Sequence, residues 1–513
     1  MRKSFVILIA LLLMALSVVC YAQTTISAQK DQVQFQETVH YGDKSVVEGV
    51  TVGMKSNYLG RLFWDSTYQI GKEPIVNTDY RFFSKWQETY FSEREYPYVH
   101  FFMEEGIIHG DERIYEEIKA DDKGLLRAYK ELYQSMKPDT DKMSESEIME
   151  YDQTDSMQIY LKDYMDYHEF DADFVLGEDF YLQLQHHMLL SNLESATKDK
   201  DSELIKKAEQ ELGWYEEIHD FFKFPVLEDE VSVLNLRMKG KTISGVGYST
   251  MNMGESTGEI DPPDAATTGD SFYPWIDSTT ANDNIYMTFD AHTYQGKIID
   301  TSLIPGGYGI YRMPYNEKKQ EIYPKELQMV YALDPKVSIV KIQADANGKN
   351  LMLFTLEEGK TYLSVIDIET MSLVQKSLFA EKDIEYMDSW MTDGYMVVYG
   401  TDIYVWDMNE SGLYENKFSI DCDKLRTQMG EYYYQTIENT AGMAFDWDGE
   451  KLLIANYIVT DFSDPRCNFY VTAFDANGLQ FFGTYKSSLD TGGSGNLNDL
   501  VEPLYGNAVS IRW

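Results

Sequence analysis

The sequence predicts a mainly β protein, a β-propeller of six to eight blades with seven as the best estimate, interrupted by a large α-helical insertion. A strand–turn–strand pattern recurs three times within residues 338–485. In addition, the last residues, 506–513, read as a strand that has no later partner in the sequence. Short strands separated by Asp, Asn and Gly turns, at a period of about 40 residues or more, are typical of propeller blades.

The three passes of the repeat share apolar runs with a period of two, separated by turn residues. The first pass has its apolar runs at 338–342, 351–354, 362–368 and 373–379, the second at 395–399, 403–407 and 413–418, and the third at 452–456, 469–475 and 479–484. The interval between the second and third passes is longer, so an inserted loop is expected there.

Residues 46–79 are expected to supply the first propeller strands. The segments 50–54 and 58–68 are rich in aromatic and β-branched residues, which strands favour. We expect the terminal strand at 506–513 to pair with this earliest part of the fold, because such pairing closes a ring of blades and removes an open sheet edge.

Residues 1–22 are predicted to be a signal peptide or an N-terminal anchor. Arg2 and Lys3 precede the apolar run 5–19, and Ala22 ends a segment with small residues where a signal peptidase cleaves. Cys20 leaves a lipoprotein signal as a further alternative. The protein is therefore expected to be secreted or held at the extracellular face of the cell membrane, and residues 23–45 to form a polar tail.

The spacing of apolar residues changes from two to nearly four between residues 80 and 224, which predicts a helical insertion. Four helical faces are expected: Leu125, Tyr129, Leu132, Tyr133 and Met136; then Met157, Tyr160, Leu161 and Tyr164; then Phe180, Leu184 and Met188; and finally Leu204, Ala208, Leu212, Tyr215 and Phe222, with Asp201 as a cap. Residues 225–513 are expected to hold the remaining blades. They include a long polar loop at 251–269 that is either functional or mobile.

The composition restricts the partners. The formal net charge is -41, from 44 basic and 85 acidic residues. A field of this sign repels nucleic acid and anionic membrane surfaces, so we expect neither as a partner. A protein, peptide or glycan ligand is consistent with it, and contact with a membrane is expected only through an uncleaved N-terminal segment.

Two cysteines remain after export, Cys422 and Cys467. In an oxidising compartment they are a candidate disulfide, and their position in neighbouring blades permits it. Two separate buried thiols are the alternative. Neither has a histidine nearby in the sequence, so a catalytic cysteine is not expected.

No motif in the sequence specifies a catalytic or metal site, and no cofactor is expected. Residues 345–348 and 446–449 resemble the start of a calcium loop, but they lack its remaining ligands and are interpreted as tight turns. Asp367, Asp407 and Asp475 recur after equivalent strands, which favours a repeated structural role.

Two further patterns are incomplete versions of known sites. Glu216 and His219 have the spacing of a di-iron pair, with His186 and His187 earlier, but a second such pair is missing. Residues 492–495 contain a serine among glycines without the following helix that a nucleophile turn requires. Both patterns are interpreted as ordinary polar or loop residues.

Aromatic residues are abundant, with 39 Tyr, 25 Phe and 8 Trp. The run 432–434, together with Trp64, Trp275, Trp390 and Trp447, could line a ring mouth and stack on sugars or peptides. The alternative is that these rings fill the spaces between blade sheets.

The three repeats resemble the broad class of YVTN-like and WD-repeat-like propellers, above all in 365–369, Val-Ile-Asp-Ile-Glu, and 405–408, Val-Trp-Asp-Met. The whole chain resembles uncharacterised exported propeller proteins of Gram-positive bacteria. This resemblance implies a fold and no active site. The expected function is an extracellular binding or scaffold protein. The alternatives are a propeller enzyme that acts on polysaccharide or peptide through carboxylates at the ring mouth, and a membrane-tethered sensor domain.

Overall fold

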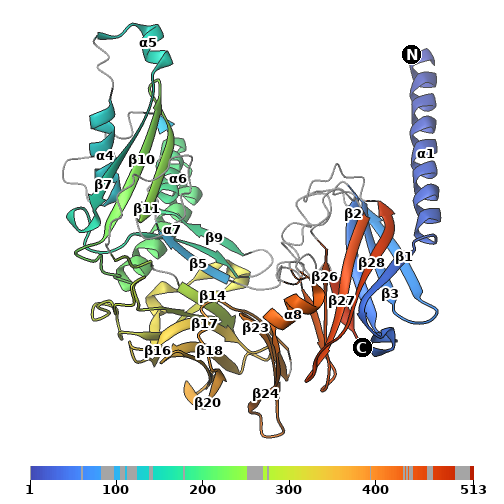
Figure 1. Cartoon of the computed structure of the whole chain (residues 1–513). Helices are drawn as coiled ribbons and strands as arrows, with labels where there is room; N and C mark the ends of the chain where they lie inside the picture. Colours follow the sequence, from blue (N-terminus) through green and yellow to red (C-terminus); the bar gives the residue numbers. More distant parts are fainter. Residues whose placement is uncertain are drawn as a thin grey trace. The chain divides into compact units, whose positions relative to one another are not determined.

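The computed structural model describes residues 2–58, 62–82, 98–103, 110–111, 124–137, 142–176, 180–250, 270–273, 276–392, 394–430, 434, 437, 443–458, 466–490 and 509–513. The chain forms two compact units (Figure 1). The terminal unit contains Met1–Glu95 and Tyr386–Trp513, and the middle unit contains Tyr96–Glu385. Each unit is described by itself.

The described residues of the terminal unit form three antiparallel sheets, with strand orders β29-β2-β3-β4, β21-β22-β23-β24 and β1-β28-β27-β26-β25. Its strands are β1 (Phe35–Gly42), β2 (Thr51–Tyr58), β3 (Leu62–Gln69), β4 (Ile75–Phe82), β21 (Asp388–Met391), β22 (Tyr395–Tyr399), β23 (Asp402–Met408), β24 (Tyr414–Asp421), β25 (Ala444–Trp447), β26 (Leu452–Tyr457), β27 (Arg466–Asp475), β28 (Gly478–Asp490) and β29 (Val509–Arg512). It also contains helices α1 (Arg2–Lys30) and α8 (Cys422–Met429) and a 3-10 turn at Lys44–Val47.

The terminal strand pairs with the first part of the fold, as expected. Strand β29 runs antiparallel to β2, with Thr51 opposite Arg512 and Met54 opposite Val509. The side chains of Val509 and Ile511 are buried in the core of this unit. The backbone N–H of Trp513 donates to the carboxylate of Asp446 on β25, at 2.7 Å, which ties this sheet to its neighbour.

Residues 23–45 are not the polar tail that the sequence suggested. They contain the end of α1 and the strand β1, which pairs with β28 as the fifth strand of its sheet. At the end of α1, Ile26 packs against the core and the hydroxyls of Ser27 and Tyr80 lie 2.9 Å apart. The polar composition of β1 is that of an exposed edge strand, whose partner lies more than 400 residues later in the sequence.

In the middle unit the described residues form four antiparallel sheets, with orders β6-β11-β10-β7, β5-β8-β9, β12-β13-β14-β15 and β17-β18-β19-β20, and β16 also pairs with β14. Its strands are β5 (Tyr98–Met103), β6 (Gly110–Asp111), β7 (Asp152–Tyr160), β8 (Phe170–Val175), β9 (Tyr181–Leu184), β10 (Val231–Lys239), β11 (Thr242–Thr250), β12 (Ile276–Ala281), β13 (Asn284–Phe289), β14 (Gly309–Asn316), β15 (Glu321–Ile322), β16 (Gln328–Ala332), β17 (Ser338–Ala344), β18 (Asn350–Glu357), β19 (Lys360–Asp367) and β20 (Ser372–Ala380). Its helices are α4 (Leu125–Met136), α5 (Glu145–Glu150), α6 (His186–Asp199) and α7 (Ser202–Phe221), with 3-10 turns at Leu161–Asp163, Glu317–Lys319 and Pro324–Glu326.

The segment 80–224 is a mixture of helices and strands and not the helical insertion that its apolar spacing suggested. The first and fourth helical faces are α4 and α7, and Asp201 caps α7 by accepting from the N–H groups of Glu203 and Leu204. The second face is wrong, because β7 forms a nine-residue antiparallel ladder with β10. The third face is also wrong, because Leu184 ends a strand before α6 begins.

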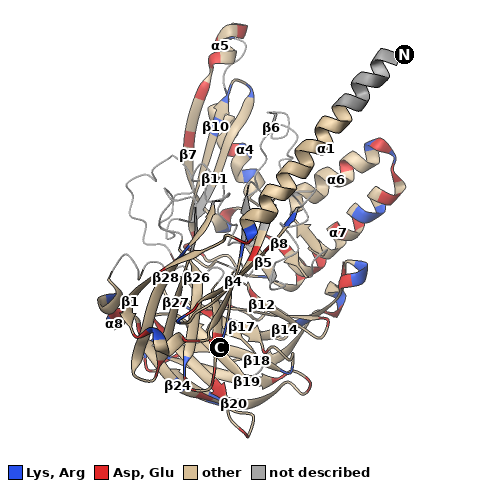
Figure 2. Cartoon of the chain, turned by 90° about the vertical axis from the view of Figure 1, so that its right-hand side faces the viewer, with Lys and Arg blue, Asp and Glu red and all other residues tan. Residues whose placement is uncertain are grey.

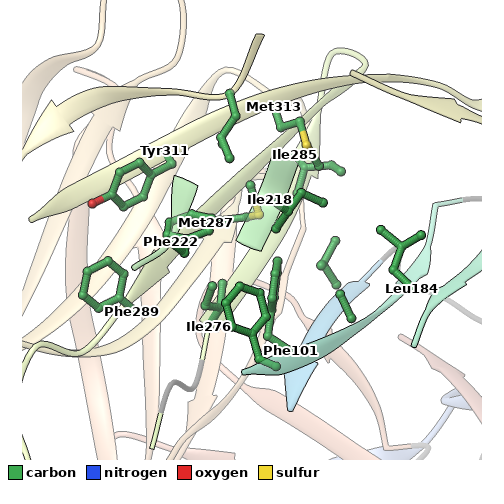
Figure 3. Close-up of a cluster of buried hydrophobic side chains, with 14 of the residues drawn as sticks. Phe101, Leu184, Ile218, Phe222, Ile276, Ile285, Met287, Phe289, Tyr311 and Met313 are labelled. Carbon is green, nitrogen blue, oxygen red and sulfur yellow. The ribbon is translucent and has the colours of Figure 1, made fainter. Parts of the chain in front are cut away.

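The core of the middle unit is formed largely by aromatic residues. The Phe222 ring, at the end of α7, lies 6.2 Å from Phe101, 5.1 Å from Tyr311 and 6.4 Å from Phe289, measured between ring centroids. Figure 3 shows part of this cluster, with side chains from β5, α7, β13 and β14 directed toward one another. Helix α7 is thus held against two sheets by large rings, which provide most of the buried apolar area of such a core.

Candidate functional site

Strand β12 joins its two neighbouring sheets through its own side chains. The Ser278 hydroxyl lies 3.0 Å from both the N–H and the carbonyl of Val99 on β5. On the opposite face of β12, the Asp277 carboxylate accepts from the Ile342 N–H and the Thr279 hydroxyl accepts from the Ala344 N–H, both on β17. Side chains of a strand alternate between its faces, so one strand holds β5 and β17 in place beside it.

A pocket of about 230 Å³ lies next to these contacts, within the middle unit. Its walls come from β12, from β13 and the turn that follows it, from β17 and from the segment before β12. The lining residues are Ser271, Tyr273, Asp277, Thr288, Phe289, Asp290, His292, Thr293, Tyr294, Ile339 and Val340. This volume is smaller than the roughly 300–1,000 Å³ typical of pockets for drug-sized ligands, so it suits a single small ring or one end group.

Asp277 is the first of two carboxylates in the pocket wall. One oxygen accepts from the Ser278 N–H at 3.0 Å and the other from the Ile342 N–H at 2.6 Å. Burial raises the pKa of Asp277 above its usual value, while Lys341 and the two backbone N–H groups act in the opposite direction. Each oxygen has one donor and retains capacity for a second.

Asp290 is the second carboxylate, directly after β13. Thr288 lies opposite Asp277 in the β12–β13 ladder, so these two residues share a face of the sheet. Asp290 follows Thr288 by two positions, and side chains two residues apart along a strand point to the same face. Asp277 and Asp290 therefore lie on the same face of this hairpin. One oxygen of Asp290 accepts from the Ser338 hydroxyl at 2.5 Å, and the other lies 2.7 Å from His292 Nδ1. Asp290 therefore orients the His292 ring, and its carboxylate is also part of the pocket wall.

A short turn at 291–298 presents His292, Thr293 and Tyr294 to the pocket, and the buried Asp270 holds this turn. The Asp270 carboxylate accepts from the Thr293 hydroxyl at 2.6 Å and from the Gln295 N–H at 3.0 Å. Lys297 Nζ lies 3.4 Å from the same carboxylate. Burial of Asp270 acts to raise its pKa, but these donors outweigh burial and lower the pKa below its usual value.

The lowered pKa predicts how stability depends on pH. Because the folded-state pKa of Asp270 lies below the unfolded value of about 3.9, its stabilisation is complete above that value and is lost as the pH falls through the folded pKa. We expect Asp270→Asn to lower the free energy of unfolding by about 2 kcal/mol between pH 5 and 7, and the difference from wild type to shrink below about pH 3.9. Thermal unfolding at several pH values measures this. A difference that widens with acidity would contradict it.

The residues that the sequence singled out lie elsewhere. Cys422 is buried at the start of α8, and the side chain of Cys467 lies outside the described residues, so their disulfide stays a prediction. Glu216 is exposed on α7, while His219 stacks between Phe170 and Tyr215, and His186 stacks on Tyr215. Within the described parts of the chain, no group of three or more His, Cys, Asp and Glu side chains is placed to hold a metal ion.

The aromatic residues proposed for a ring mouth serve as packing where they are described. Trp64 and Tyr434 are buried in the two cores of the terminal unit. Trp390 packs on Phe445, with ring centroids 4.4 Å apart, and the Trp447 ring lies 5.7 Å from Phe418. Trp275, Tyr432, Tyr433, the loop 251–269 and residues 492–495 lie outside the described residues.

The repeated aspartates have structural contacts. Asp367 accepts from both the N–H and the hydroxyl of Thr370, and Asp475 accepts from the Asn477 N–H, as expected of turn caps. Asp407 differs, because it accepts from the Trp447 indole N–H at 3.1 Å. The turn interpretation of 345–348 is confirmed, since the buried Asp345 accepts from the Lys349 N–H and Gly348 has a φ of 62°.

The two pocket acids were not singled out from the sequence. The available signal was local: Asp290 and His292 directly follow the apolar strand Asn284–Phe289. Polar residues at the end of a strand are common positions for binding residues. Their contact with Ser338 and β17 could not be inferred locally, because it depends on how two sheets pack.

No protein-family model matches the chain, and no curated protein matches it. Solved structures do match. They include the β-propeller domain of Cps50 (Swd1) from Myceliophteria thermophila, at 10% identity and a TM-score of 0.22 over 50% of this chain and 82% of that one. A protein from Lactobacillus plantarum matches at 13% identity and a TM-score of 0.23, over 49% and 62% of the two chains. A chain of a mitotic checkpoint complex matches at 11% identity and 0.23, over 45% and 60%.

This chain is similar to β-propeller structures. It is mainly β, with several antiparallel sheets of four and five strands and with helices in addition. The match spans about 60% of the mitotic checkpoint chain. At these identities and TM-scores the matches carry no argument about function, and the ring of six to eight blades stays a prediction.

Proposed function

We propose that this protein is an exported binding protein that holds a small group of a peptide or glycan in the pocket beside β12. The observation that carries the proposal is that one pocket is lined both by two carboxylates, Asp277 and Asp290, and by three aromatic side chains, Tyr273, Phe289 and Tyr294. Aromatic faces and a few converging polar groups are the usual components of a ligand pocket.

The N-terminal helix supports export. Its segment Leu11–Lys30 has a mean hydropathy of 1.7 and none of it is buried in the protein. In Figure 2 the tan part of α1 has no residue coloured as acidic or basic until Lys30 at its end, and residues 11–29 contain none. An apolar helix of this kind at the start of a chain serves as a secretion signal or as an anchor, and the proposal holds for either.

Binding is tested with Asp290→Asn, which keeps the size of the side chain and removes its charge. Hydrogen bonds to charged groups contribute about 1.5–3 kcal/mol each, so we expect affinity for a ligand found on a glycan and peptide array to fall roughly 10- to 100-fold. Isothermal titration calorimetry measures this. Asp300→Asn is the matched control, because Asp300 is exposed, lies outside the pocket and hydrogen-bonds to the nearby Ser302.

The same ligands and variants separate a binding function from a catalytic one. Two carboxylates in one pocket are also the arrangement that glycoside hydrolases use. Incubation of the wild-type protein with the ligands should leave them intact. Turnover that is abolished by Asp277→Asn or Asp290→Asn and kept by Asp300→Asn would replace the binding proposal with an enzyme.

A further inference from the structure

The charged residues that line the pocket are unequally divided between acidic and basic. Two of its lining residues are acidic and none is Lys or Arg. Lys341 lies near Asp277 and acts on its charge. Lys297 lies 3.4 Å from Asp270 and 3.5 Å from Asp229, both outside the pocket wall. In the part of the chain that the structure describes, Asp290 has an ion-pair contact with His292 and none with Lys or Arg.

The walls around Asp290 suit a cation. Three aromatic side chains, Tyr273, Phe289 and Tyr294, line the pocket. Tyr294 is 74% exposed, so its ring is accessible to a ligand at the pocket opening. Ring faces attract cations, and most strongly where water is displaced. The net charge of -41 also favours the approach of positive ligands.

The remaining walls fit the carbon skeleton of such a ligand. Ile339 and Val340 from β17 contribute apolar surface, and Ser271 and Thr288 lie among the lining residues as well. An ammonium group offers three N–H donors, and Asp277 and Asp290 retain acceptor capacity for them. A phosphate or carboxylate would instead meet two acids, with no Lys or Arg in the wall.

Building on the proposed function, we propose that the group held in this pocket is an aliphatic ammonium carried by a small skeleton, as on an amino sugar or a lysine side chain. The Asp290 carboxylate pairs with the cation, and the Tyr294 ring covers it from the mouth. The two sources share the same chemistry, and the probes below distinguish them.

The experiment uses the full chain and two matched pairs of probes: glucosamine with glucose, and Nα-acetyl-lysine amide with Nα-acetyl-norleucine amide. Calorimetry at pH 7 should give an affinity at least about tenfold higher for the ammonium member of one pair, and the preferred pair identifies the source. Raising the salt concentration should weaken only the ammonium member, because charge pairing is screened.

Three variants locate the effect. Asp290→Asn should reduce the preference for the ammonium probe to about twofold or less, while Asp300→Asn, with the same change in net charge, should preserve it. Tyr294→Ala removes an exposed ring, so it should leave thermal unfolding unchanged and still weaken the ammonium probe several-fold. The Tyr294→Ala variant keeps the test decisive if Asp290→Asn alters the fold.

The outcomes separate the two proposals. If glucose or the norleucine amide binds as tightly as its ammonium partner, the ammonium inference is overturned and the binding function stands. The same conclusion follows if Asp290→Asn weakens the charged and the uncharged probe of a pair equally and Asp300→Asn weakens neither. If none of the four probes binds saturably and no array ligand depends on Asp290, both proposals fail.

Discussion

Deletion of residues 509–513 is expected to destabilise the terminal unit more than any other small change. Strand β29 contributes two buried side chains, Val509 and Ile511, and complete burial of such a side chain contributes about 1.5–3 kcal/mol. Their loss therefore costs about 3–6 kcal/mol, before the unpaired edge of β2 is considered. Typical domains are stable by only about 5–15 kcal/mol.

Differential scanning calorimetry is the appropriate measurement. For a unit of this size, such a loss corresponds to a decrease in Tm of roughly 10–20 °C. The control is Arg512→Ala, which changes an exposed residue of the same strand and should shift Tm by less than about 2 °C. If the deletion unfolds at the wild-type temperature, β29 does not close this sheet and the account of the terminal unit is wrong.

The repeat was predictable because its signals are local. Turns such as 345–348 and 367–370 are specified by an aspartate that binds its own backbone, with Gly348 supplying a positive φ. Strands β18 and β19, which are consecutive in the sequence, form a hairpin with a regular register. The residues that form such turns and hairpins lie next to each other in the sequence, so the sequence pattern is sufficient to predict them.

The segment around β7 shows why another part was not predictable. Met157, Tyr160, Leu161 and Tyr164 have helical spacing, yet β7 pairs with β10, about 75 residues later. Only Leu161 of these four is fully buried, in a 3-10 turn. Strand β1 is a similar case, because its partner β28 is distant and its own residues are mostly polar. In both cases a long-range ladder outweighs local preference.

The candidate site was beyond the sequence for the same reason. Asp277 and Asp290 are close in the sequence, but Ser338 and Ile342, which orient them, come from the next sheet. The polar loop 251–269, which the sequence predicts to be either functional or mobile, is outside the described residues, so its role stays a prediction. The local sequence predicts the strand and the polar residues that follow it. The pocket depends on the packing of two sheets, which only the structure shows.

Asp270→Ala is expected to have the second largest effect, on both stability and binding. The variant removes the acceptor for the Thr293 hydroxyl and for the N–H groups of Gln295 and Ser271. Leaving buried donors without a partner costs about 1–3 kcal/mol per group, and partial access of water to the freed groups reduces the sum to about 2–4 kcal/mol. Thermal unfolding of the middle unit should therefore shift down by roughly 5–15 °C.

The same substitution should weaken ligand binding at least about tenfold, although Asp270 itself is not part of the pocket wall. It acts by holding the turn that carries His292, Thr293 and Tyr294, so the expected signature is lost affinity with an unchanged preference among probes. Asp229→Ala is the control, because Asp229 is exposed and shares only Lys297 with Asp270. Equal melting and equal affinity for the two variants would mean that Asp270 does not position the turn. In that case the pocket is organised by β12 and β17 alone.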